Sequence, residues 1–273
     1  MKYSAYILLL LPALFSCEKE TDWKISEDIS DFIVVDGIIT SELKAHRISL
    51  SRPVTELNAV PAPVFGAYVT IDDGDTTLVL TENPEGSGNY YTDSTFVGVT
   101  GKEYTLNILH LGREYTAKTE MLPVAIDFLE ITFSMKISDS LYFISNVGGG
   151  YDVDDPSMYE FIIDWSHLPK YQSFPDSACK AKMWFYVLST IDVSQLLPPS
   201  KETIYFPKNT KIIVKQYSLT PEHVAFIRSV LSETEWKGGI FDVESANTET
   251  NLSEGAIGYF GACTVISDTV EVE

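Results

Sequence analysis

Short runs in which apolar and polar residues alternate recur along the chain from residue 32 onward. Residues 32–40 (FIVVDGIIT) are rich in β-branched side chains, and residues 47–52 (RISLSR) place Ile48 and Leu50 on one face. This period of two predicts strands with one buried face. Further runs follow turn signals such as Asp73-Gly74, so about seven short strands fit within residues 32–123 and predict an immunoglobulin-like β-sandwich. Within the first run, Asp36-Gly37 predicts a β-bulge.

The second half of the chain continues the strand pattern and adds one helix. Thr220 is a predicted N-cap, Pro221 takes the first helical position, and apolar residues recur at helical spacing to about residue 236. Residues 124–273 therefore form a second predicted β-rich domain with one packed α-helix near 221–236. Its predicted strands cover residues 128–135, 141–145, 158–165, 181–190, 211–217, 255–266 and 269–272.

The N-terminus reads as an export signal. A lysine at position 2 precedes the apolar run of residues 6–11 (YILLLL), which is far shorter than the roughly 20 residues needed to cross a bilayer. Residues 1–16 are therefore a predicted lipoprotein signal peptide. Leu14 and Ser16 before Cys17 resemble the lipobox of bacterial lipoproteins, which implies lipidation of Cys17. The alternative is an ordinary secretory peptide with an incidental cysteine.

Residues 17–31 are the predicted lipidated tether. The acidic stretch 18–22 (EKETD) resembles the surface-export signals of Bacteroidota lipoproteins, and the alternative is a plain solvated linker. A flexible coil of this length spans only about 20 Å. We therefore expect a protein held close to the outer membrane by its lipid and facing the cell exterior.

The charge of the chain excludes one class of partner. It carries 19 Lys and Arg against 39 Asp and Glu, a formal charge of −20. Nucleic-acid binding depends on cationic side chains that displace counterions from phosphates, so nucleic acid is not an expected partner. At 45% hydrophobic and 12% aromatic residues, the composition is that of a folded protein.

Two cysteines follow Cys17, namely Cys179 and Cys263. In an exported chain such a pair is a candidate disulfide, and closing so long a loop could contribute about 4 kcal/mol. However, Cys263 lies in an apolar run (YFGACTVI), where a free cysteine serves as a small hydrophobic residue. Both alternatives stay open from the sequence.

The sequence contains none of the common catalytic motifs considered next. The four histidines lack zinc-ligand spacing, and neither a nucleophile elbow nor a phosphate-binding loop is present. We therefore predict that the protein is not an enzyme and needs no cofactor. Calcium is the one candidate ion, because Asp152, Asp154 and Asp155 crowd a glycine-rich loop and could supply oxygen ligands. The alternative is that these residues serve the turn itself.

Aromatic residues in or beside predicted loops are candidates for ligand contact, since exposed rings can stack on a sugar or anchor a protein contact. The alternative role for each of them is packing in a sandwich core. The candidates are Tyr90, Tyr91, Tyr151, Tyr171, Phe174 and Trp236.

Several motifs together resemble a known family. They are the lipobox, residues 34–38 (VVDGI), 90–93 (YYTD), 101–106 (GKEYTL), 214–217 (VKQY), 240–242 (IFD) and 255–260 (GAIGYF). In this order the chain resembles the Bacteroidota outer-membrane lipoproteins grouped as domain of unknown function 4249. The resemblance implies a lipoprotein encoded beside TonB-dependent receptors, and it carries over no catalytic residue. Some members have a second cysteine near residues 251–253, which this chain lacks, so Cys179 has only Cys263 as a partner.

The expected function is that of a binding or accessory module on the cell surface, working with an outer-membrane TonB-dependent receptor in nutrient uptake. An adhesive or structural surface protein is the alternative. A carbohydrate-active enzyme is the third hypothesis. It ranks below the other two because a glycosidase needs two facing carboxylates and the sequence does not single out such a pair.

Overall fold

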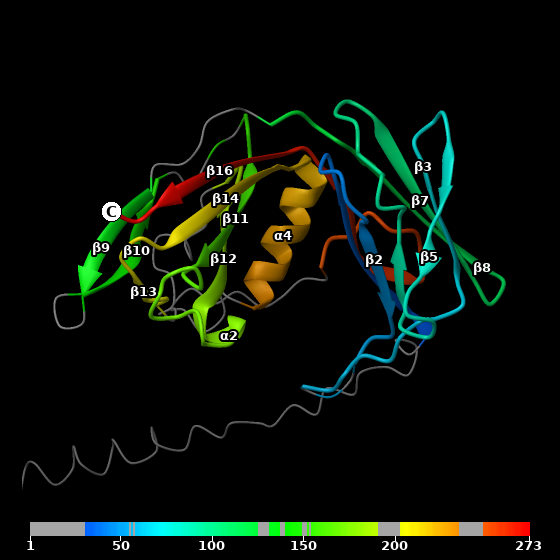
Figure 1. Ribbon diagram of the computed structural model, residues 1–273. Helices are drawn as coiled ribbons and strands as arrows, with labels where there is room; N and C mark the ends of the chain where they lie inside the picture. The colour runs from blue at the N-terminus through cyan, green and yellow to red at the C-terminus, as the bar shows by residue number, and fades with distance from the viewer. Residues whose placement is uncertain are drawn as a thin grey trace, which may run out of the picture.

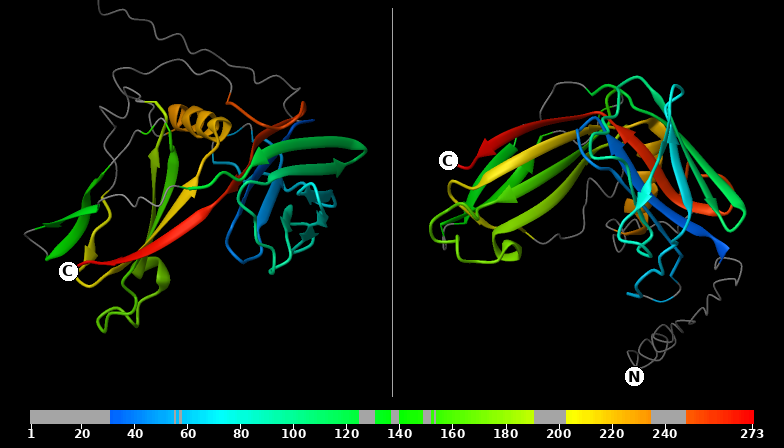
Figure 2. Two further views of the ribbon diagram at one scale, coloured as in Figure 1. Left: turned by 90° about the horizontal axis from the view of Figure 1, so that it is seen from above. Right: turned by 45° about the vertical axis from the view of Figure 1, so that its right-hand side comes forward.

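The computed structural model describes residues 31–273 except 55, 57, 125–130, 137–139, 149–151, 153, 191–202 and 235–247. The described chain is mainly β, as the alternating pattern predicts, and its strands form two lobes that lie side by side (Figures 1 and 2). The predicted signal peptide and Cys17 lie outside the described residues. Among the described residues, no helix is long and apolar enough to span a membrane.

The first lobe is a sandwich of two sheets. The larger sheet has the strand order β15-β1-β2-β6-β5 and the smaller one the order β4-β3-β7-β8. The strands of the larger sheet are β1 (Ile33–Thr40), β2 (Arg47–Ser51), β5 (Thr81–Glu82), β6 (Asn89–Tyr91) and β15 (Ala256–Cys263). Those of the smaller sheet are β3 (Tyr68–Asp72), β4 (Thr77–Val79), β7 (Glu103–His110) and β8 (Arg113–Glu120).

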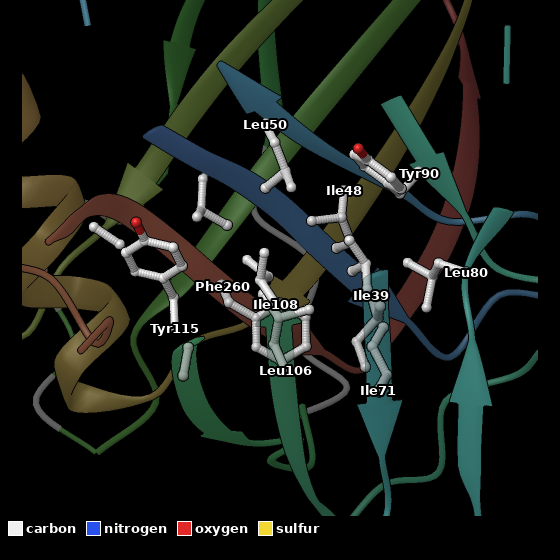
Figure 3. Close-up of a cluster of buried hydrophobic side chains, with 14 of the residues drawn as sticks. Ile39, Ile48, Leu50, Ile71, Leu80, Tyr90, Leu106, Ile108, Tyr115 and Phe260 are labelled. Carbon is white, nitrogen blue, oxygen red and sulfur yellow. The ribbon is translucent and has the colours of Figure 1, made fainter. Parts of the chain in front are cut away.

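Alternation along these strands produces the core of the first lobe (Figure 3). Ile33, Val35 and Ile39 of β1 point inward, whereas Val34 and Asp36 between them face outward. The inward side chains of both sheets interdigitate in one cluster that also includes Ile48, Leu50, Ile71, Leu106, Ile108 and Phe260. The predicted sandwich is therefore confirmed, and its stability rests on aliphatic and aromatic burial.

The division into domains differs from the predicted one at the C-terminus. Residues 256–263 were assigned to the second domain, but as β15 they pair in parallel with β1 over its whole length. Gly258 allows this close pairing, because a Cβ there would lie 2.1 Å from the carbonyl oxygen of Val35. A strand so distant in sequence completes the first lobe, which the local pattern of residues 32–123 does not reveal.

The predicted bulge at Asp36-Gly37 is not formed. The register of β1 runs without a break against both neighbours, and Gly37 lies opposite Ile48. A Cβ at Gly37 would lie 2.3 Å from Cδ1 of Ile48. The glycine therefore leaves room for the Ile48 side chain to pack against the backbone of a regular strand.

The second lobe consists of a four-stranded sheet, β12-β11-β14-β16, and a three-stranded sheet, β13-β10-β9. Its core includes Phe161, Ile163 and Val214 from the larger sheet and Phe206 from the smaller one. Its strands are β9 (Ile131–Lys136), β10 (Leu141–Val147), β11 (Ser157–Asp164), β12 (Lys180–Val187), β13 (Phe206–Pro207), β14 (Lys211–Ser218) and β16 (Val265–Glu271). A short helix, α2 (Asp176–Cys179), precedes β12.

Helix α4 (Pro221–Glu233) lies between the two lobes (Figure 1). As predicted, Thr220 caps it, and the hydroxyl accepts a hydrogen bond from the backbone N–H of His223 at 3.2 Å. The helix ends at Glu233, before the predicted residue 236. Its apolar side packs in what we call the junction cluster, defined by Met158, Leu188, Tyr217, Leu219, Val224, Ile227, Leu231 and Cys263.

Candidate functional site

A pocket of about 330 Å³ lies beside the junction cluster, between the first lobe and the open face of the second-lobe sheet. The first lobe contributes Ile38 and Thr40 from the end of β1 and Lys44 from the turn that follows it. The second lobe contributes residues of β11, β12 and β14. Because both lobes supply walls, the pocket exists only when they are held together.

Strand alternation explains why charged side chains line the second-lobe wall. Glu160 of β11 lies directly between Trp184 of β12 and Lys215 of β14, and Lys182 is two residues from Trp184 on the same strand. Residues paired across strands share one face of the sheet. The opposite face carries Phe161 and Val214 and packs into the core of the second lobe.

Five charged side chains form ion pairs in and beside the pocket. Glu42 accepts hydrogen bonds from Lys44 at 2.5 Å and from Lys215 at 2.6 Å, so the second of these pairs joins the two lobes. Glu160 is only 7% exposed and pairs with Lys182, whose own side chain is 56% exposed. The buried glutamate thus holds a lysine at the open side of the pocket.

The pKa values of the two carboxyl groups are both lowered. Burial alone would raise the pKa of Glu160, but hydrogen bonds from Lys182 and Tyr217 outweigh it. The same competition lowers the pKa of Glu42, where Lys215 and Lys44 are the donors. Burial and the hydrogen bond to Glu160 raise the pKa of Tyr217, so its hydroxyl stays neutral and donates a hydrogen bond to the Glu160 carboxylate at 2.7 Å.

These titration properties suit binding better than proton transfer. A general acid or base works best with a pKa near the operating pH. Glu42 and Glu160 are instead held ionised by lysine partners. The pocket therefore presents fixed charges to whatever enters it.

The family profile for the domain of unknown function DUF4249 matches residues 18–269, nearly the whole chain. The chain belongs to the DUF4249 family. A search of curated proteins found no match. The sequence resemblance is thus confirmed at the level of the family, whose name assigns no activity to the pocket.

Two of the aromatic candidates in this DUF4249 chain lie in or beside the first lobe's core. Tyr90 is buried, its hydroxyl donating to the carbonyl of Val64 at 3.0 Å and accepting from the N–H of Ala67 at 2.9 Å. The prediction that Tyr90 contacts ligand is therefore wrong, because its polar end is already satisfied inside the protein. Tyr91, the next residue on β6, is half-buried and points to the other face of its sheet.

Tyr171 and Phe174 lie together in the second lobe, with ring centroids 5.9 Å apart. Tyr171 is half-buried and packs against the second-lobe core, while Phe174 is 53% exposed. Neither of them lines the pocket. The last two candidates, Tyr151 and Trp236, lie outside the described residues.

The candidate calcium loop is organised by its own backbone. One carboxylate oxygen of Asp152 accepts from the N–H groups of Asp154 and Asp155 at 2.9 and 3.1 Å. This arrangement is an Asx-turn, which agrees with the alternative that these aspartates serve the turn itself. Within the part of the chain that the structure describes, no group of three or more His, Cys, Asp or Glu side chains could hold a metal ion.

Cys179 and Cys263 do not form the candidate disulfide in this DUF4249 protein. Both are free and buried, Cys179 in the second-lobe core and Cys263 in the junction cluster. Because they belong to separate cores, each acts as a small hydrophobic residue. Burial also raises the pKa of Cys263 to about 12, so this thiol stays protonated.

Sequence reasoning missed the pocket residues. A signal was present, because the charged residues of each strand fall on one face, two positions apart in β12 and four positions apart in β11 and β14. Such positions are usually solvent-facing and draw no attention. What the sequence could not supply was the first-lobe turn that brings Glu42 and Lys44 against them.

Proposed function

We propose that this DUF4249 protein is a lipid-anchored binding module of the outer membrane, facing the cell exterior and serving a TonB-dependent receptor in nutrient uptake. The single observation that carries the binding role is the pocket between the lobes, with its ion-paired walls. The lipobox-like sequence ending at Cys17 supports the anchor. In this proposal the lipid keeps the pocket within reach of a receptor in the same membrane.

A co-purification experiment tests the partnership. Tagged full-length protein is extracted from outer membranes in mild detergent, and the bound proteins are identified. We expect a TonB-dependent receptor to be enriched over a control extract from cells that carry an unrelated tagged lipoprotein. Recovery of the protein without a receptor would contradict the proposal.

The anchor has its own test. In a Cys17→Ala variant we expect the folded protein to leave the membrane fraction, and a nutrient-specific growth defect to match that of a deletion strain. An attachment defect without a growth defect would instead support adhesion. Full function of the released protein would overturn the role of the lipid.

A further inference from the structure

The charge of the pocket is opposite in sign to that of the chain. Lys44, Lys182, Lys215 and Glu160 line the pocket. Glu42 lies beside it and pairs with Lys44 and Lys215, so these five ion-paired groups together leave a surplus of one positive charge. The whole chain has a formal charge of −20. A local field of this sign attracts an anion, whereas most of the remaining surface repels it.

Both carboxylates keep their charge at neutral pH, so the surplus is not removed by titration. Glu42 is held by two lysines, and Glu160 is held by Lys182 and the Tyr217 hydroxyl. A single negative charge on a ligand would balance the site. A dianion would leave the occupied site with a net negative charge, and a neutral ligand would leave the positive charge uncompensated.

An exposed aromatic ring lies next to the surplus charge. Trp184 is 39% exposed, whereas Glu160, which lies opposite it on β11, is buried. Its ring lies 5.9 Å from that of Tyr217, and the Lys182 ammonium lies 6.0 Å from its centroid. Aromatic rings that remain accessible beside a cation are suited to stack on a flat or cyclic ligand that carries a negative charge.

The size of the pocket limits the ligand. Sites for drug-sized molecules measure about 300–1,000 Å³. At about 330 Å³ this pocket is at the small end of that range. The volume therefore fits one ring and its substituents, with Ile38 and Ile162 as apolar wall.

We propose that the pocket between the lobes binds a small monocarboxylate built on a single ring, with the ring on Trp184 and the carboxylate on Lys182 and Lys215. This assignment rests on the proposed binding function and specifies its ligand class. Two kinds of molecule share the chemistry, an aromatic acid and a sugar acid. Lys182 is the more exposed of the two lysines, with 56% of its side chain accessible while its ammonium pairs with Glu160.

Calorimetric titration of the purified full chain tests the proposal with benzoate and glucuronate as probes. Benzyl alcohol and glucose serve as neutral counterparts, and inorganic phosphate as a different anion. We expect at least one carboxylate to bind at least tenfold more tightly than its neutral counterpart and than phosphate. The carboxylate that binds identifies an aromatic or a sugar acid. If neither binds, or if phosphate binds as well, the proposal is wrong.

Two exposed positions allow variants that should keep the fold, and thermal unfolding checks that they do. We expect Lys182→Gln and Trp184→Ala each to weaken carboxylate binding at least tenfold. Lys118→Gln is the matched control, because Lys118 pairs with Glu103 on the first-lobe surface, away from the pocket. Binding that survives both pocket variants would place the ligand elsewhere and overturn the assignment.

The result separates this inference from the receptor partnership. If the receptor co-purifies but no carboxylate binds, the ligand class is wrong while the proposed partner stands. If a carboxylate binds but no receptor is recovered, the pocket is correct and the partnership fails.

Discussion

The core of the first lobe and the junction between the lobes differ in the polarity of their side chains. The first-lobe cluster is closed and apolar, with Ile39, Leu106 and Phe260 at its centre (Figure 3). At the junction, the apolar packing of α4 adjoins a face lined by Glu160, Lys182 and Trp184. Apolar burial therefore stabilises the fold, whereas the charged face beside α4 is where we propose that a ligand binds.

The largest loss of stability should come from a substitution in β15, the distant strand that completes the first-lobe core. Phe260 is 0% exposed in the first-lobe core, so Phe260→Ala should lower the free energy of unfolding by about 3–5 kcal/mol. Denaturant titration measures the loss. Ile257→Ala on the same strand is the control, because Ile257 is partly exposed and should cost far less. Equal losses would mean that β15 does not complete the first core.

Acidification should weaken both regions through one buried histidine each. Burial lowers the pKa of His46 in the first lobe and of His223 in α4 to about 4. A histidine whose pKa is depressed on folding contributes stability above its unfolded pKa of about 6.5 and loses it as the pH falls toward 4, roughly 2–3 kcal/mol each. Unfolding free energies at pH 7 and 4.5 measure this loss.

Variants assign the acid sensitivity to each region. His46→Gln and His223→Gln should each flatten the pH dependence between 6.5 and 4.5, whereas the carboxyl groups, unchanged in both variants, should contribute equally in all three proteins. If neither variant changes the slope, these histidines are not the groups that titrate.

The buried carboxylate of the junction should have a smaller effect. Glu160→Gln removes the charge that Lys182 and Tyr217 share and should cost about 1–2 kcal/mol. Because folding lowers the pKa of Glu160, its stabilisation is present above the unfolded value near 4.5 and disappears at more acidic pH. Glu103→Gln in an exposed pair is the control and should cost under about 0.5 kcal/mol.

The smallest effect on stability should come from adding a reducing agent. Cys179 and Cys263 are both free, so a reducing agent should leave the melting temperature unchanged. Thiol titration of the denatured chain should count both of them. A loss of stability on reduction would show that a disulfide forms after all.

The sequence allowed most strands and the helix to be predicted, because their signals are local. Thr220 and Pro221 mark the start of α4, and alternation marks β1, β7 and β8. The pairing of β15 with β1 was not predictable, since strand alternation says nothing about which distant strand is the neighbour. The bulge predicted at Gly37 is wrong for another reason, because alternation does not reveal how closely the Ile48 side chain of β2 approaches that glycine.

The candidate site was less predictable than the fold. Tyr90 looked accessible beside a turn, but its hydroxyl is satisfied by the backbone of Val64 and Ala67. The lysines and glutamates of the pocket come from two lobes, and only tertiary packing brings Glu42 to Lys215. Charged residues on solvent-facing strand positions carry no sequence mark that separates a binding wall from an ordinary surface.

A crystal structure of the full chain with the carboxylate that gives the strongest calorimetric signal tests the central claim most directly. The account predicts the ligand between the lobes, its ring against Trp184 and its carboxylate within hydrogen-bond distance of Lys182 or Lys215. A ligand bound elsewhere, with the Glu160–Lys182 pair and the pocket unchanged, would contradict it.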